Sequence, residues 1–149
     1  MIHIEIGATK VVQDRLKTTK IEDSKGASLV FCWDTHLTKI KGRNVLFIVN
    51  ASNRYTIAMT DIEPRNWNYY TMYIRSVIHG VMQEMGYSED QIGQYFKMSG
   101  DTTVTKTHGR KSVGGINRMV MDAQYFGKKL EKEAKYQWEL SEYLNRDIC

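Results

Sequence analysis

The chain has 149 residues, of which 42% are hydrophobic and 26% charged, with one proline and a net charge of +4. This size and composition are typical of a single globular domain over residues 1–149, and they exclude disordered and collagen-like chains. No apolar run approaches the ~20 residues that cross a bilayer, and the first residues lack the pattern of a signal peptide. We therefore expect a cytoplasmic protein without membrane contact.

The cysteines predict neither a disulfide framework nor a metal site. Cys32 and Cys149 are the two cysteines of the chain, and they lie far apart in the sequence. No set of His, Cys, Asp and Glu residues has the spacing of metal ligands. We expect a reducing compartment, no bound metal and no cofactor.

The first half of the chain predicts a strand, a helix and then a strand meander. Within residues 2–6, β-branched isoleucines alternate with polar residues. Residues 8–17 carry apolar side chains at helical spacing. Residues 29–59 are rich in β-forming residues and are interrupted by turn sequences at 41–43 and 51–53. Three or four antiparallel strands are expected there.

The second half predicts helices around one further strand. Residues 66–86 have a helical apolar stripe, and residues 88–97 form a second helix with Ser88 as N-cap. A strand at 101–107 precedes a long helix over about 112–145. The fold class is α+β, a mostly antiparallel sheet covered by helices with a long C-terminal helix. We expect this helix to project and to form a homo-oligomer.

Positive charge is concentrated at one place in the chain. Residues 102–118 contain four Lys or Arg side chains and no acidic residue, which equals the net charge of the whole chain. An extended strand would place Lys106 and His108 on one face, and a helix that starts near Ser112 would present free backbone amides beside Arg110. This arrangement favours an anion such as phosphate, and the alternative is a solvated basic turn.

A second polar cluster comes from the predicted meander. Its members are Trp33, His36, Lys39, Lys41, Arg43, Asn50, Arg54 and Tyr55. Arg54 beside Tyr55 would bind a phosphate and stack on a base. The alternative is that Trp33 and Tyr55 are buried residues of the sheet.

The histidines offer a third possibility. His36 begins one H-x-T element of the kind that two-histidine phosphoesterases use twice, but the segment at His108 lacks the hydroxyl residue. Two histidines can act as general acid and base on a phosphodiester without a metal. No serine or cysteine nucleophile motif is present. We assign no catalytic residue and keep a metal-independent phosphodiesterase using His36 and His108 as an alternative.

Several short motifs occur along the chain. They are F-x-W at Phe31 and Trp33, VN-x-x-x-RY at Asn50, Arg54 and Tyr55, and KT-x-x-R at Lys106, Thr107 and Arg110, followed by Gly114 and Asn117. Together these motifs resemble a small, uncharacterised bacterial and phage domain family of unknown function. The resemblance runs from about residue 4 to residue 126, and it leaves the last segment outside the shared pattern. Lys111 stands where the family pattern often has serine.

These observations predict a non-catalytic protein that binds an anionic, nucleotide-type small molecule. The expected ligand-binding residues are Trp33, His36, Asn50, Arg54, Tyr55, Lys106, Thr107, His108, Arg110 and Asn117. In a phage setting, this character is similar to that of sponge proteins that sequester nucleotide signals of host immunity, inside a bacterial host cell. A nucleic-acid-binding module would use the same cations, and a purely structural interaction module would bind no small ligand.

Overall fold

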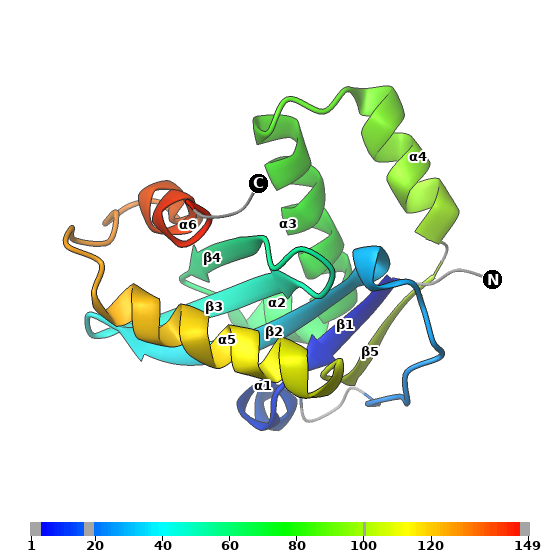
Figure 1. Cartoon of the computed structure of the whole chain (residues 1–149), viewed down its shortest axis with the longest axis horizontal. Helices are drawn as coiled ribbons and strands as arrows, with labels where there is room; N and C mark the ends of the chain where they lie inside the picture. The colour runs from blue at the N-terminus through cyan, green and yellow to red at the C-terminus, as the bar shows by residue number, and fades with distance from the viewer. Residues whose placement is uncertain (1–3, 17–19, 100, 147–149) are drawn as a thin grey trace.

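A computed structural model describes residues 4–16, 20–99 and 101–146. A five-stranded sheet lies in the middle, with helices on both faces (Figure 1). The strands are β1 (Ile4–Ala8), β2 (Cys32–Ile40), β3 (Arg43–Asn50), β4 (Thr56–Thr60) and β5 (Thr102–Lys106). The helices are α1 (Lys10–Arg15), α2 (Pro64–Asn68), α3 (Tyr70–Glu84), α4 (Glu89–Ser99), α5 (Gly109–Gln124) and α6 (Trp138–Leu144), and a short 3-10 helix, Leu29–Phe31, precedes β2. The predicted α+β class, a sheet covered by helices, is confirmed.

The sheet is mixed, whereas the sequence predicted a mostly antiparallel one. Its strand order is β4-β3-β2-β1-β5. The meander β2-β3-β4 is antiparallel as predicted, but β1 pairs in parallel with both β2 and β5. Apolar periodicity reveals which segments are strands and which face is buried, but it carries no information about the direction of pairing. The parallel half of the sheet was therefore not predictable from the pattern.

The β2–β3 hairpin closes through a two-residue turn at the predicted position. Lys41 and Gly42 have φ angles of 51° and 81°. Positive φ at both central positions is the mark of a type I′ turn, whose twist matches that of the flanking strands. Glycine at the second position adopts this conformation without steric cost.

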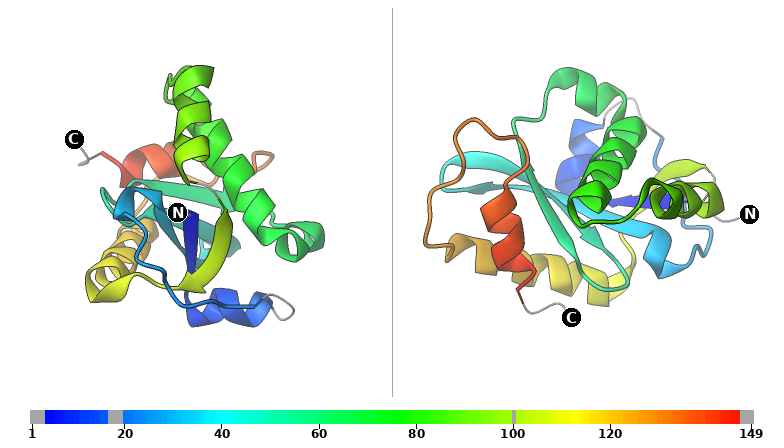
Figure 2. Two further views of the ribbon diagram at one scale, coloured as in Figure 1. Left: turned by 90° about the vertical axis from the view of Figure 1, so that its right-hand side faces the viewer. Right: turned by 90° about the horizontal axis from the view of Figure 1, so that it is seen from above.

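Two layers of helices bury the two faces of the sheet. On one face, α3 buries Ile74 and Ile78 against a cluster that includes Ile6 and Ile48. On the other face, α5 and α6 pack Ile116 and other apolar side chains over β3 and β4. The left view of Figure 2 shows α3 and α5 on opposite sides of the sheet. Alternate residues of each strand therefore belong to different layers.

Helix α4 begins at the predicted cap. The Ser88 hydroxyl accepts a hydrogen bond from the Gln91 amide at 3.2 Å, and the Gln91 side chain accepts one from the Ser88 amide at 2.8 Å. This reciprocal pair is a capping box. Glu89 and Asp90 in the first turn also favour this end of the helix dipole.

The prediction of one long helix over 112–145 is wrong. Helix α5 ends at Gln124, residues 125–137 are irregular, and α6 begins at Trp138. The Thr60 amide donates to the Lys135 carbonyl at 2.7 Å, and the Gln137 amide donates to the Ala58 carbonyl at 2.9 Å. These bonds fold the segment back onto the edge strand β4, and tertiary pairing thus overrides the helical propensity of the charged run. The segment therefore packs on the sheet instead of projecting as a continuous helix.

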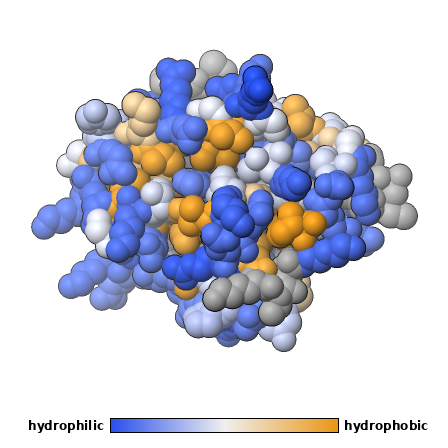
Figure 3. Space-filling model, turned by 90° about the horizontal axis from the view of Figure 1, so that it is seen from below, coloured by the Kyte–Doolittle hydropathy of each residue, from blue (hydrophilic) through white to orange (hydrophobic). Residues whose placement is uncertain are grey.

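The surface seen from the α1 side is mostly hydrophilic. Figure 3 shows apolar patches there, separated from one another by polar side chains. No helix in the described part of the chain combines the length and apolar character that crossing a bilayer requires.

Candidate functional site

Two carboxylates are buried in the middle of the sheet. Glu5 of β1 and Asp34 of β2 are both fully shielded from solvent. In the register of these parallel strands, Glu5 lies opposite Cys32 and Gly7 lies opposite Asp34. A charged group is costly to bury unless it is paired and hydrogen-bonded. The partners of these two carboxylates therefore define a candidate site.

His108 pairs with both carboxylates. Its Nδ1 lies 2.6 Å from Asp34 Oδ1, and its Nε2 lies 2.8 Å from Glu5 Oε1. The His108 backbone amide also donates to Asp34 Oδ2 at 3.1 Å, and the Ser112 hydroxyl donates to the same oxygen. We call Glu5, Asp34, His108 and Ser112 the buried polar cluster. It joins β1 and β2 to the start of α5.

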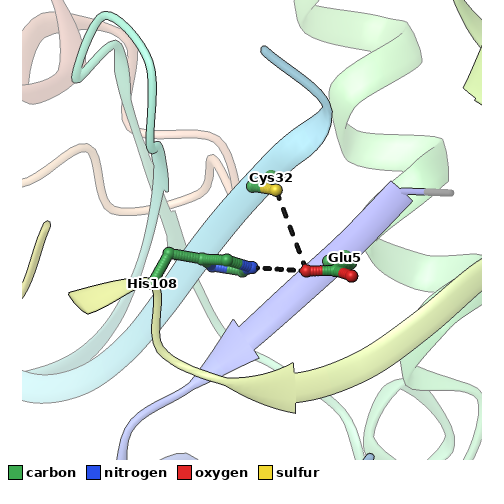
Figure 4. Close-up of side chains that lie close together, drawn as sticks. All are labelled: Glu5, Cys32 and His108. Atoms are coloured by element: carbon green, nitrogen blue, oxygen red, sulfur yellow. Dashed lines mark hydrogen bonds and ion pairs between the residues drawn. The ribbon is translucent and has the colours of Figure 1, made fainter. Parts of the chain in front are cut away.

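The segment before β2 completes the surroundings of Glu5. The Ser24 hydroxyl donates to Glu5 Oε1 and the Lys25 amide donates to Oε2, each at 2.7 Å. The Cys32 thiol lies 3.9 Å from Glu5 Oε1 (Figure 4). Glu5 is thus contacted from β2, from residues 24–25 and from His108.

The charges in the buried polar cluster stabilise one another. Burial alone lowers the pKa of His108, but the hydrogen bond and charge of Asp34, together with Cys32 and Glu5, raise it to about 11. Burial also raises the pKa of Glu5, but hydrogen bonds from Ser24, His108 and Lys25 hold this pKa below its ordinary value. The cluster therefore holds an imidazolium between two carboxylates.

A separate cavity lies on the other side of the sheet, the side that α3 covers. Its volume is about 400 Å³, and we call it the aromatic cavity. It is lined by Val30, Trp33, Asn50, Asn53, Tyr55, Met82, Met85, Tyr87, Gln91, Gln94, Tyr95 and Met98. None of these side chains is charged. The walls come from the ends of β2 and β3, from α3 and from α4.

Hydrogen bonds fix the orientation of two aromatic walls of this cavity. The Trp33 indole N–H donates to the Tyr95 hydroxyl at 2.9 Å, and that hydroxyl donates to the Val30 carbonyl at 2.9 Å. Burial raises the pKa of Tyr95 to about 12, so its hydroxyl stays neutral. The Asn50 amide nitrogen donates to the Val30 carbonyl at 3.1 Å, which ties β3 to the same point.

Comparison with protein families identifies one match. A family model for a domain of unknown function, DUF6933, matches residues 5–149. The chain belongs to the DUF6933 family. Because the match reaches residue 149, the prediction that the segment after Phe126 lies outside the shared pattern is wrong. Searches of curated proteins and of solved structures found no match.

The predicted ligand-binding residues of this DUF6933 chain lie in several places. Trp33, Asn50 and Tyr55 line the aromatic cavity. Lys106, Arg110 and Asn117 are exposed, and Thr107 is half-buried. The aromatic cavity is lined by none of the predicted cations. The structure therefore brings the predicted aromatic residues together without the predicted basic ones.

Arg54, His36 and His108 contact different parts of the fold. A Cβ atom on Gly115 of α5 would lie 3.4 Å from Arg54 Cδ, so the Arg54 side chain runs along this helix. His36 Nδ1 lies 2.8 Å from the Thr9 hydroxyl, and burial lowers the pKa of His36. The His108 side chain is only 6% exposed, and both of its ring nitrogens contact carboxylates. The two histidines thus have separate partners.

Sequence reasoning missed Glu5, Cys32, Asp34 and Ser112 as site residues. One signal was present, because Glu5 stands inside a β-branched strand where its neighbours Ile4 and Ile6 are buried. A carboxylate in such a strand needs a partner. The identity of that partner depends on the parallel pairing of β1, which the sequence pattern did not encode.

Proposed function

We propose that this DUF6933 chain is a binding protein that captures a small molecule with a planar, nucleobase-type group in the aromatic cavity. The observation that carries the proposal is the composition of this cavity: aromatic rings, methionines and amides, with no charged side chain among its described lining residues. A volume of about 400 Å³ is within the range of small-molecule pockets. Tightly fixed rings lose little freedom when a ligand stacks on them.

The lining matches the two requirements of a nucleobase. Trp33, Tyr55, Tyr87 and Tyr95 offer flat apolar surfaces for its faces. Gln94 on α4 carries an amide group that both donates and accepts hydrogen bonds, as the edge of a base requires. The Gln91 side chain offers its amide nitrogen as a donor, because its oxygen already accepts from the Ser88 amide. Asn50 contributes less to recognition, because its side-chain oxygen already accepts hydrogen bonds from the Ser52 and Asn53 amides.

A phosphate attached to this group would lie outside the aromatic cavity. Tyr55 and Met85 also line a second cavity of about 360 Å³, and Arg146 is the one cation among its described lining residues. The guanidinium of Arg146 lies 4.1 Å from the centre of the Tyr143 ring. We place the phosphate of a bound nucleotide on this side of Tyr55, near the Arg146 guanidinium, one of whose N–H groups donates to the Tyr143 carbonyl at 2.6 Å.

A second candidate function is nucleic-acid binding. Lys106, Arg110 and Lys111 are exposed around the end of β5 and the start of α5, without contact with the aromatic cavity. Such a patch would bind phosphate backbones through charge alone. Its affinity would fall steeply with salt and rise with the length of the nucleic acid, whereas binding in the aromatic cavity would select one small molecule.

The proposed function is tested with a panel of nucleosides and of linear and cyclic nucleotides. Each compound is incubated with the protein, unbound compound is removed, and bound compound is released by heat and identified by mass. Recovery of one compound intact supports the proposal, and sequestration of a nucleotide signal, as by a phage protein acting against host immunity, would give this result. Recovery of an altered compound would instead indicate an enzyme. Retention of no compound would contradict the proposal.

A further inference from the structure

A carboxylate, an imidazole and a thiol, three side-chain types that bind metals, lie close together. Glu5 and His108 belong to the buried polar cluster, and Cys32 lies beside it. Glu5 Oε1, Cys32 Sγ and His108 Nε2 all lie within 4.8 Å of one another. Figure 4 shows the three side chains pointing toward one point, from β1, from β2 and from the segment after β5. The residues are far apart in the sequence, which is why their spacing gave no sign of a site.

The separations of these atoms are close to those of a tetrahedral site. Zinc–ligand distances of about 2.0–2.3 Å place neighbouring ligands of a tetrahedral ion roughly 3.3–3.8 Å apart. Cys32 Sγ lies 3.9 Å from Glu5 Oε1, and His108 Nε2 lies 2.8 Å from the same oxygen. An ion would thus need His108 and Glu5 to separate by only a fraction of an ångström.

The surrounding hydrogen bonds orient the donors as in known metal sites. A metal-bound histidine usually donates its other ring N–H to a carboxylate, which fixes the ring and its tautomer. His108 Nδ1 lies 2.6 Å from Asp34 Oδ1, which leaves Nε2 directed at Glu5 and Cys32. Asp34 is itself held by the His108 amide and by Ser112, and Glu5 is held by Ser24 and Lys25.

The charge of the cluster also favours a cation. Glu5 and Asp34 are fully buried, and His108 is the one basic side chain that contacts both of them in the described structure. Two buried carboxylates with one basic partner leave an excess of negative charge. A divalent ion would take the position of the proton between His108 Nε2 and Glu5 Oε1, and this proton and the proton of the Cys32 thiol would both pass to solvent.

We propose that Glu5, Cys32 and His108 bind a transition-metal ion of the zinc type. A thiolate together with an imidazole selects zinc-like ions over calcium and magnesium, which prefer oxygen ligands alone. Because Glu5 and Cys32 are fully buried, the ion's role is structural, with water in the fourth tetrahedral position that these three side chains leave. The ion joins β1, β2 and the start of α5, and this role is independent of ligand binding in the aromatic cavity.

The test is a titration of the reduced protein with Co²⁺, followed by displacement with Zn²⁺. We expect one Co²⁺ per chain, with a thiolate-to-cobalt charge-transfer band that Zn²⁺ removes. Cys32→Ser should abolish this band, and Cys149→Ser, the matched control, should keep it. Asp34→Asn should keep the band and weaken the affinity by about 10–100-fold. Absence of the band in the natural protein, or its persistence in Cys32→Ser, would overturn the proposal.

A second measurement requires no change at the site. X-ray absorption by the zinc-loaded Cys149→Ser protein should show one sulfur in the first coordination shell and nitrogen or oxygen ligands besides. A shell without sulfur would contradict the site even if the Cys32→Ser protein failed to fold.

Discussion

Gly7 of β1 lies directly against Asp34 of the buried polar cluster. A Cβ atom at this position would overlap Asp34 Oδ1 and come within 2.9 Å of Asp34 Cγ. Asp34 cannot move aside easily, because His108 and Ser112 hold both of its oxygens. Even a methyl group has no room here.

We predict that Gly7→Ala lowers the free energy of unfolding by about 3 kcal/mol, at the upper end of the usual cost of overpacking. Chemical denaturation measures this loss. The control is Gly93→Ala in α4, where a Cβ atom meets nothing within 4 Å. It should stabilise the protein by about 0.5–1 kcal/mol. Equal stability of the two variants would show that Asp34 is not held as described.

For single residues, the sequence predicted some of the side chains that line one cavity, but it did not predict which side chains the site residues contact. Trp33, Asn50 and Tyr55 were predicted as one group and do line one cavity. His108 was predicted to face an external anion, but its ring contacts Glu5 and Asp34. The two carboxylates precede His108 by 103 and 74 residues. Only the assembled sheet brings them together.

The segment from Lys135 to Asn145 covers β4, an edge strand of the sheet. The Ser141 hydroxyl accepts a hydrogen bond from the Ala58 amide at 3.0 Å. The Asn145 side chain accepts from the Thr56 amide at 2.7 Å and donates to the Thr56 carbonyl at 2.8 Å. Unpaired edge strands promote aggregation, and these side chains instead form hydrogen bonds with backbone groups of β4 from within the same chain.

We predict that Ser141→Ala lowers the free energy of unfolding by about 1–3 kcal/mol, because the buried Ala58 amide loses its acceptor. Ser52→Ala, at an exposed turn position, should change stability by less than about 0.5 kcal/mol. Thermal and urea unfolding of both variants measure the difference. An unchanged Ser141→Ala protein would mean that this side chain does not anchor α6 to β4.

The stability of helix α4 depends on its N-terminal cap at Ser88, and side chains of this helix line part of the aromatic cavity. Removal of the Ser88 hydroxyl should cost about 1 kcal/mol, and its effect should be local to α4. We predict faster amide hydrogen exchange across α4 in Ser88→Ala, whereas Ser88→Asp, which retains a capping oxygen, should exchange like the natural protein. Uniform acceleration across the whole chain would contradict a local capping role.

Sequence patterns predicted correctly those features of the helices and turns that depend on neighbouring residues alone. The cap at Ser88 and the turn at Lys41 and Gly42 depend on local geometry, and both were predicted correctly. The long C-terminal helix was predicted from apolar side chains at helical spacing together with the charged run. Its interruption after Gln124 depends on hydrogen bonds to β4, more than seventy residues away in the sequence. No local pattern encodes such a contact.

In the whole molecule, β2 serves both candidate sites. Trp33 points to the layer of α3 and lines the aromatic cavity, while its neighbours Cys32 and Asp34 point to the layer of α5. This follows from the alternation of side chains along a strand. The proposed metal would hold the strands together on one side of the sheet, and the proposed ligand would bind on the other.

The most direct test of the central claim is to fill the aromatic cavity from its exposed wall. Gln94 and Lys97 are both exposed on α4, but only Gln94 lines the cavity. The measurement is the amount of nucleotide or nucleoside per chain recovered by heat release from Gln94→Trp and from the matched control Lys97→Trp. We predict that Lys97→Trp retains the compound bound by the natural protein. At compound concentrations well below the dissociation constant, Gln94→Trp should retain about a tenth of it, as a tenfold weaker affinity requires. Equal retention by two folded variants would contradict binding in this cavity.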